Sequence, residues 1–189
     1  MLRAADIAMS GAKYNFDDLV DRRNTSCEKW DFLEENFGYD DLLPLWVADM
    51  DFRSPQPVID ALVSRAKHGI YGYTGLTNGY YDSVIGWYRR RYGWEIRKEW
   101  IVYTPGVVPA ISLAIRAFSN PGDKIIVQTP VYYPFFKSIE SNGRQVLNNR
   151  LKLEGDRYEM DFDDLEEKAK DSRARIMILC SPHNPVGRV

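Results

Sequence analysis

Several short segments of this 189-residue chain bring polar side chains or backbone amides to places where they could do chemistry. One is residues 181–187, S-P-H-N-P-V-G, which follow the apolar run 176–180. A short apolar run that ends in a loop rich in Pro, Asn and Gly is typical of a buried strand. Ligands of open α/β sheets lie just outside the carboxyl ends of such strands. The pattern therefore predicts a polar loop, with Asn184 in it, at the edge of a sheet.

A second segment, Thr104-Pro105-Gly106, leads into a predicted helix over residues 107–118. The start of a helix presents unpaired N–H groups at the positive end of its dipole, an arrangement suited to a phosphate. Many strand-to-helix junctions share this pattern and bind nothing, so both interpretations stay open. The chain has neither G-x-G-x-x-G nor G-x-x-x-x-G-K-[ST], so a dinucleotide site and a P-loop lose their main support.

Two aromatic segments could form the walls of a site. Tyr132 and Tyr133 follow the predicted strand 124–128, where one ring could stack on a heteroaromatic ligand. Such stacking is worth about 0.5–1.5 kcal/mol beyond burial. The alternative is that both tyrosines only pack their helix. Tyr71 and Tyr73 lie in a glycine-flanked loop, where a hydroxyl could reach a phosphate, although the segment could equally be a plain loop.

Asp49 and Asp51 form a pair of carboxylates at positions i and i+2, within W-V-A-D-M-D-F at residues 46–52. Such a pair could bind a metal or do acid–base work. No His or Glu cluster accompanies the pair, so no metal site is predicted. The alternative is an extended loop with its aromatic side chains buried and Asp51 exposed.

The elements that must position these residues alternate between helix and strand. Helices are expected at 55–68, 80–92, 107–118, 132–141 and 163–170, and strands at 101–103, 124–128, 145–149 and 176–180. Such alternation predicts an α/β domain with a mostly parallel sheet and helices on both faces. Residues 14–52 are polar, aromatic-rich and weakly periodic, so we divide the chain into an N-terminal arm and extension at 1–54 and an incomplete large domain at 55–189.

The composition narrows the function classes. A net charge of −2 gives no reason to expect nucleic acid, and no apolar stretch approaches a membrane span. Two cysteines, Cys27 and Cys180, make no disulfide framework, so a cytoplasmic location is expected. Residues 1–12 have no apolar core of a secretion signal and are expected to form a loose extension.

Taken in order, these segments resemble one family, the fold-type I pyridoxal-phosphate (PLP) enzymes. Within it they are most similar to the MalY/PatB-type cysteine-S-conjugate β-lyases, or cystathionine β-lyases. The resemblance extends from about residue 14 onward, and its segments are D-R-R-N-T at 21–25, K-W-D at 29–31, L-W-V-A-D-M-D-F at 45–52, and residues 69–73, 105–108, 129–135 and 180–187. D-R-R-N-T and W-V-A-D-M-D-F point to the lyases, whereas the N-P-x-G loop fits any class I or II aminotransferase.

The resemblance implies a role for particular residues. The backbone amides of Val107 and Val108 would hold the PLP phosphate, Tyr132 would stack on the pyridine ring, and Asn184 would hydrogen-bond its phenolic oxygen. Tyr73 would reach the phosphate of the neighbouring subunit's cofactor, which implies a homodimer. Three residues of the arm would lie near the substrate entrance: Trp46, Asp49 and Met50.

The implied reaction is β-elimination from a small sulfur-containing amino acid, giving a thiol, pyruvate and ammonia. This chemistry needs a Schiff-base lysine. In the family that lysine lies downstream of the N-P-x-G loop, so it is expected beyond Val189, and we expect no lyase turnover from these 189 residues alone. The alternatives are an aminotransferase of the same fold, a non-catalytic truncated product and, more remotely, a metal-dependent or nucleotide-binding α/β enzyme.

Overall fold

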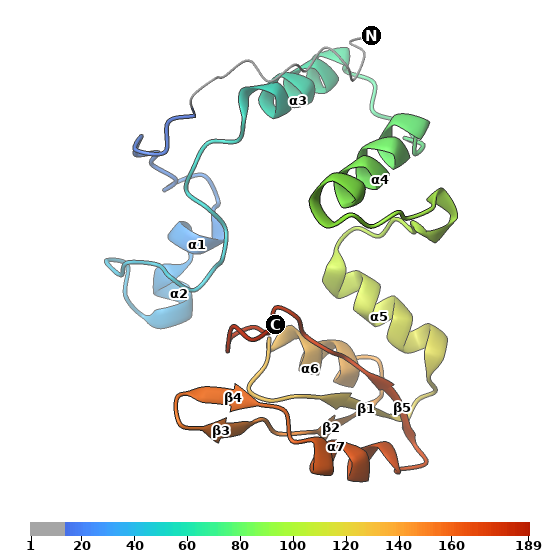
Figure 1. Cartoon of the computed structure of the whole chain (residues 1–189). Coiled ribbons are helices and arrows are strands. Elements are labelled where there is room, and N and C mark those ends of the chain that lie inside the picture. The colour runs from blue at the N-terminus through green and yellow to red at the C-terminus, as the bar shows by residue number, and fades with distance from the viewer. Residues whose placement is uncertain (1–13) are drawn as a thin grey trace. The chain divides into compact units, whose positions relative to one another are not determined.

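The computed structural model describes residues 14–189, so the predicted extension at 1–12 lies outside the described residues. The chain divides into two units, one ending at Leu76 and the other spanning Thr77–Val189 (Figure 1). Among the described residues, no helix has both the length and the apolar character needed to cross a membrane.

The first unit contains the predicted arm and one long helix. The arm includes two short helices that the sequence pattern did not predict, α1 (Glu28–Asp31) and α2 (Leu33–Phe37). Leu33, the first residue of α2, is buried. The ring of Phe37 meets that of Trp46 edge-on, with 5.3 Å between the ring centroids. The helix α3 (Gln56–His68) begins after Pro55 and ends at Gly69, as expected. Gly69 has a φ of +74°, which an L side chain rarely adopts.

The second unit begins with the helix α4 (Asn78–Tyr92), which Thr77 caps and Gly93 ends. A short 3₁₀ turn, η1 (Lys98–Trp100), follows. The strand expected at 101–103 is wrong, because these residues pair with no other described strand. The Ile101 N–H instead closes the 3₁₀ turn by donating to the Lys98 carbonyl at 3.1 Å.

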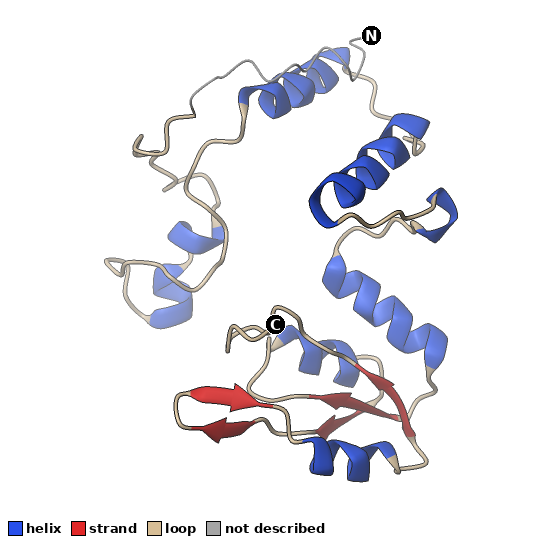
Figure 2. Ribbon diagram, viewed as in Figure 1, coloured by secondary structure: helices blue, strands red, loops and turns tan. Residues whose placement is uncertain are grey.

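The remaining residues form the predicted α/β domain. Along the chain its elements are α5 (Val107–Phe118), β1 (Lys124–Val127), α6 (Pro134–Glu140), β2 (Gln145–Asn148), α7 (Phe162–Ala169) and β5 (Ala174–Met177). The strands pair in the order β2-β1-β5, and both pairings are parallel, which confirms the parallel sheet (Figure 2). The strands end earlier than expected, although the Ile178 N–H still donates to the Ile126 carbonyl at 2.9 Å.

The core lies between the sheet and two helices. Ile125 and Val127 of β1 point to one face, where they pack with Ile115 of α5 and with Phe135 and Ile139 of α6. This grouping follows from the period of two along a strand and of three to four along a helix. In Figure 1 the sheet lies between α6 and α7, so helices cover both faces as predicted.

One hairpin was not predicted. The strands β3 (Lys152–Glu154) and β4 (Arg157–Glu159) pair antiparallel, with Glu154 opposite Arg157. The two-residue turn between them contains Gly155 at a φ of +64°, a conformation that suits glycine.

Candidate functional site

The start of α5 presents backbone donors as the sequence predicts. Gly106, at a φ of +153°, leads into the helix, and its carbonyl accepts from the Ala110 N–H at 3.1 Å. No residue of the described chain accepts a hydrogen bond from the N–H of Gly106, Val107 or Val108. No acidic side chain occupies the first turn of this 12-residue helix. Unpaired amides at the positive end of a helix dipole fit a phosphate.

Tyr132 lies between β1 and α6, where it is held by its neighbours and still reaches solvent. Its ring meets the Phe135 ring edge-on at 5.6 Å and 89°. Tyr132 is 36% exposed, whereas Tyr133 is 75% exposed. Phe135 belongs to the buried core, so its contact orients the Tyr132 ring without covering the whole residue. This geometry fits a residue that stacks on a ligand ring.

The loop after β5 carries Asn184 at the protein surface. The Asn184 N–H donates to Cys180 Sγ at 3.4 Å. The backbone of His183 closes the loop, because its N–H donates to the Arg188 carbonyl and its carbonyl accepts from the Gly187 N–H, both at 2.6 Å. No partner for the side-chain amide of Asn184 occurs between residues 14 and 189, so this amide can donate to a ligand oxygen.

His183, to which sequence reasoning gave no role, connects this loop to the loop of Tyr132. It is only 6% exposed, and its Nε2 lies 2.9 Å from the carbonyl oxygen of Pro130. Pro130 follows β1 and precedes Tyr132 by two residues. The structure thus brings together the two loops that carry Tyr132 and Asn184. The only sequence signal for His183 was its place inside S-P-H-N-P.

The arm contains a network of charged groups. Arg22 binds Asp49 with one guanidinium nitrogen and Asp51 with another, the second contact at 2.6 Å. Asp51 also accepts from Lys29 Nζ at 2.7 Å and from Trp30 Nε1 at 2.9 Å. The hydrogen bonds from Lys29, Trp30 and Arg22 hold the pKa of Asp51 well below its usual range. The hydrogen bond from Arg22 likewise lowers the pKa of Asp49.

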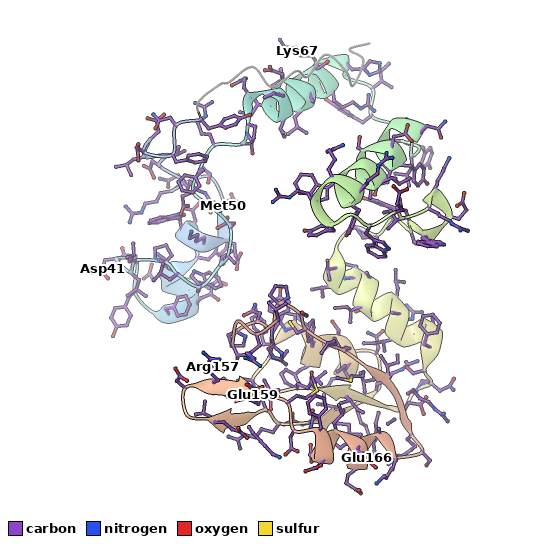
Figure 3. The ribbon with its side chains drawn as sticks, viewed as in Figure 1. Asp41, Met50, Lys67, Arg157, Glu159 and Glu166 are labelled. Atoms are coloured by element: carbon purple, nitrogen blue, oxygen red, sulfur yellow. The ribbon has the colours of Figure 1, made fainter. Side chains whose placement is uncertain are left out.

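These contacts show where the arm residues lie. Trp46 Nε1 donates to the Lys29 carbonyl at 3.2 Å, so D-R-R-N-T, K-W-D and W-V-A-D-M-D-F are one bonded unit. The alternative of buried aromatics beside an exposed Asp51 is wrong, because Trp46 and Phe52 are only partly buried, at 37% and 48% exposed, and Asp51 is itself partly buried. Met50, in the loop after α2, is 76% exposed (Figure 3).

Tyr73 lies in the loop after α3 and is fully exposed. Residues 14–189 contain no group of three or more His, Cys, Asp and Glu side chains that could hold a metal ion.

A buried amide pair lies at the carboxyl ends of β1 and β2. Gln128 is 1% exposed and Asn149 is fully buried, and Gln128 Nε2 donates to Asn149 Oδ1 at 3.2 Å. Asn149 Nδ2 in turn donates to the Asp161 carbonyl at 3.0 Å and to Asp164 Oδ2 at 2.7 Å. The pair ties the ends of β1 and β2 together, and the loop that carries Tyr132 leaves from the end of β1.

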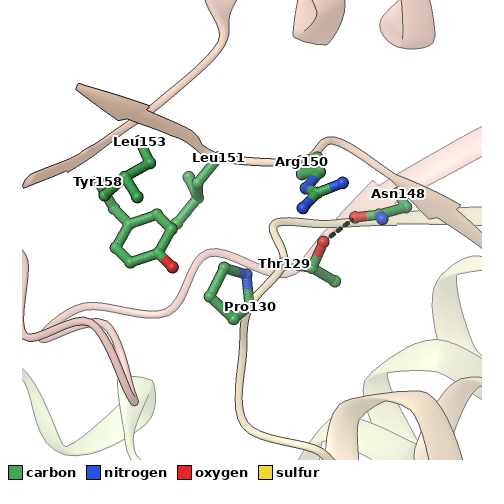
Figure 4. Close-up of a pocket in the computed structure, with 7 residues that line it drawn as sticks. All are labelled: Thr129, Pro130, Asn148, Arg150, Leu151, Leu153 and Tyr158. Atoms are coloured by element: carbon green, nitrogen blue, oxygen red, sulfur yellow. Dashed lines mark hydrogen bonds between the residues drawn. The ribbon is translucent and has the colours of Figure 1, made fainter. Parts of the chain in front are cut away.

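A cavity of about 570 Å³ lies beside this pair, under the β3–β4 hairpin (Figure 4). Within it Thr129 Oγ1 donates to Asn148 Oδ1 at 2.9 Å. Its lining is Thr129, Pro130, Asn148, Arg150, Leu151, Leu153 and Tyr158. None of the predicted cofactor residues lines this cavity. The candidate site is therefore formed by the start of α5 and by the loops that carry Tyr132 and Asn184, and not by this cavity.

The chain is similar in sequence to proteins of known name. The chain is 48% identical over 174 residues to cystathionine beta-lyase PatB of Bacillus subtilis, covering 92% of this chain and 45% of that protein. It is 36% identical over 177 residues to protein MalY of Escherichia coli, covering 93% and 45%. The chain therefore spans about half the length of the curated relatives it matches.

Solved structures give the same picture. Cystalysin from Treponema denticola, described as containing pyridoxal 5′-phosphate, matches with a TM-score of 0.86 and 40% identity over 94% of this chain and 45% of that chain. A PLP-bound putative aminotransferase from Clostridium difficile matches with a TM-score of 0.88 and 46% identity over 94% of this chain and 46% of that chain. The family model "Aminotransferase class I and II" matches residues 41–189. This chain belongs to the class I and II aminotransferase family.

Proposed function

We propose that this chain is the cofactor-binding part of a PLP-dependent carbon–sulfur β-lyase, which cleaves cystathionine and cysteine S-conjugates to a thiol, pyruvate and ammonia. One observation carries the proposal, the extent of the likeness to the lyases. The PatB match covers 92% of the chain, so it begins no later than about residue 16 and includes the arm. By contrast, an aspartate aminotransferase from Sulfolobus acidocaldarius matches 76% of the chain at 27% identity.

Residues of the second unit would bind the cofactor. The N–H groups of Val107 and Val108 would hold the phosphate, because they have no partner among the described residues. Tyr132 would stack on the ring, and the Asn184 amide would donate to the ring's phenolic oxygen. Bound PLP supplies an acceptor for the electrons released when the α-proton of the substrate leaves. We assign the Schiff-base lysine to no residue of this chain.

The arm would line the substrate side of the site. Met50 offers an exposed apolar side chain that suits a thioether or thiol leaving group. Asp49 would act through its ion pair with Arg22, which holds the loop between Trp46 and Met50.

Assembly and location complete the proposal. Tyr73 would contact the phosphate of a second subunit's cofactor, so the protein would be a homodimer. Its proposed location is the cytoplasm. The division into an arm at 1–54 and a large domain at 55–189 stays a prediction. Size-exclusion chromatography with light scattering would test the dimer, and a monomer at micromolar concentration would contradict it.

An acceptor-free assay tests the reaction. A purified protein that contains this chain, loaded with PLP, should release pyruvate from L-cystathionine when no keto acid is added. Lactate dehydrogenase and NADH report the pyruvate continuously, and a thiol reagent reports the second product. Absence of pyruvate while PLP is bound would contradict the lyase proposal.

An aminotransferase is the second candidate, and the likeness to the PLP-bound putative aminotransferase from Clostridium difficile favours it. Such an enzyme needs a keto-acid acceptor to turn over. Amino-group transfer to 2-oxoglutarate, with no thiol released, would support this candidate over the lyase.

A further inference from the structure

His183 is held between the two loops that carry the proposed ring contacts. Its side chain is almost fully buried, at 6% exposed. Its Nε2 lies 2.9 Å from the Pro130 carbonyl oxygen, on a residue 53 positions away in the sequence. A carbonyl oxygen only accepts hydrogen bonds, so Nε2 carries the proton and donates it.

The bond spans the distance between two separate strand ends. Pro130 lies in the segment that follows β1, and Tyr132 comes two residues later, where its carbonyl accepts from the Phe135 N–H at 3.1 Å. Asn184 comes directly after His183, and its N–H is bound to Cys180 Sγ. Movement of the imidazole would therefore move Asn184 relative to Tyr132.

We propose that His183 is a positioning residue, whose hydrogen bond to Pro130 sets the place of the Asn184 amide relative to the Tyr132 ring. It contacts no part of the ligand itself. The bond fixes the polar contact and the stacking surface as one unit, whereas the phosphate-binding amides of α5 belong to a separate helix start. This inference rests on the proposed function, because it assumes that Tyr132 and Asn184 hold the cofactor ring.

The ring tautomer tests the hydrogen bond without any cofactor. Long-range ¹H–¹⁵N correlation spectra of the protein that contains this chain show the histidine ring signals, and the signal that disappears in His183→Gln is assigned to His183. We expect His183 to carry a proton on Nε2. A ring protonated on Nδ1 alone would overturn the proposal.

Cofactor binding tests the positioning role in the PLP-loaded protein that contains this chain. His183→Ala should weaken PLP affinity roughly tenfold and shift the absorbance maximum of the bound cofactor, since one hydrogen-bonded constraint is lost. Binding of inorganic phosphate at α5 should not change. His183→Gln, whose amide can donate to Pro130, should recover most of the affinity and the spectrum. His68→Ala, on the exposed end of α3, is the control and should match the unchanged protein.

The outcomes separate this inference from the proposed function. If the unchanged protein binds PLP and His183→Ala binds it equally well with the same spectrum, the positioning role is wrong. If the unchanged protein binds no PLP, the proposed function fails, and this inference fails with it. If His183→Ala does not fold, as judged by its far-ultraviolet circular dichroism, His183→Gln and the tautomer decide the question.

Discussion

Replacing Asn149 with alanine should destabilise the α/β domain strongly, although its neighbour Asn148 can be replaced at little cost. Asn149 is fully buried and holds Gln128 Nε2 at 3.2 Å and the Asp161 carbonyl at 3.0 Å. Asn148 is exposed and makes a single bond, to Thr129 Oγ1. The two residues have the same side chain and adjacent positions, so they form a matched pair.

The magnitude follows from the groups left behind. In Asn149→Ala, Gln128 Nε2 loses its partner inside the protein, and an unsatisfied buried donor costs about 1–3 kcal/mol. The lost bonds to the Asp161 carbonyl and to Asp164 Oδ2 add about 0.5–1.5 kcal/mol each. Gln128 Oε1 already has no partner, so the whole Gln128 amide would then be buried and unpaired. We expect a loss of about 2–6 kcal/mol in the free energy of unfolding.

Urea unfolding followed by far-ultraviolet circular dichroism measures this loss, and hydrogen exchange of peptides from β1 and β2 locates it. Asn148→Ala should change the free energy of unfolding by about 0.5 kcal/mol or less, as surface substitutions do. If the two variants agree within about 0.5 kcal/mol, the reasoning from buried amides is refuted.

Three further predictions test the core, the arm and the ring contact. Ile115→Ala, in the core at 1% exposed, should cost about 2–5 kcal/mol in urea unfolding, whereas Val107→Ala, at 75% exposed, should cost little. The pKa of Asp51 is lowered in the folded arm, so its stabilisation is present above about pH 4 and is lost as the pH falls below that value. Tryptophan fluorescence should report this loss on acid titration, since Trp30 donates to Asp51, and Asp51→Asn should flatten the titration. Tyr132→Ala should weaken PLP binding roughly two- to twelvefold while Tyr132→Phe retains it, because stacking needs only the ring. Equal binding by these two variants would argue against stacking.

Helices and parallel strands were predictable where a local sequence pattern marked them, such as a glycine at a helix end or a continuous apolar run. Gly69 and Gly93 end α3 and α4 because both adopt positive φ, and the sequence pattern placed both helix ends. The apolar runs around Ile125 and Ile176 gave β1 and β5, since strands covered on both faces are apolar throughout.

Elements that depend on a partner were harder to predict. Residues 101–103 have a strand-like composition, but no strand among residues 14–189 pairs with them, and no local pattern reveals that. The β3–β4 hairpin did leave a signal, because Leu153 and Tyr158 each lie between charged residues around a Gly-Asp turn. The roles of His183 and Lys29 were missed because each depends on contacts more than twenty residues away.

The ion pairs of the arm also determine where a segment of this protein could be exchanged with that of a relative. The family model begins at residue 41, between the two halves of the network, since Arg22 and Lys29 come before that point and Asp49 and Asp51 come after it. A chimera joined at residue 41 would combine one parent's cations with another parent's carboxylates. Grafting this arm onto an aminotransferase of the same fold would therefore require moving residues 22–51 together, as a single cassette.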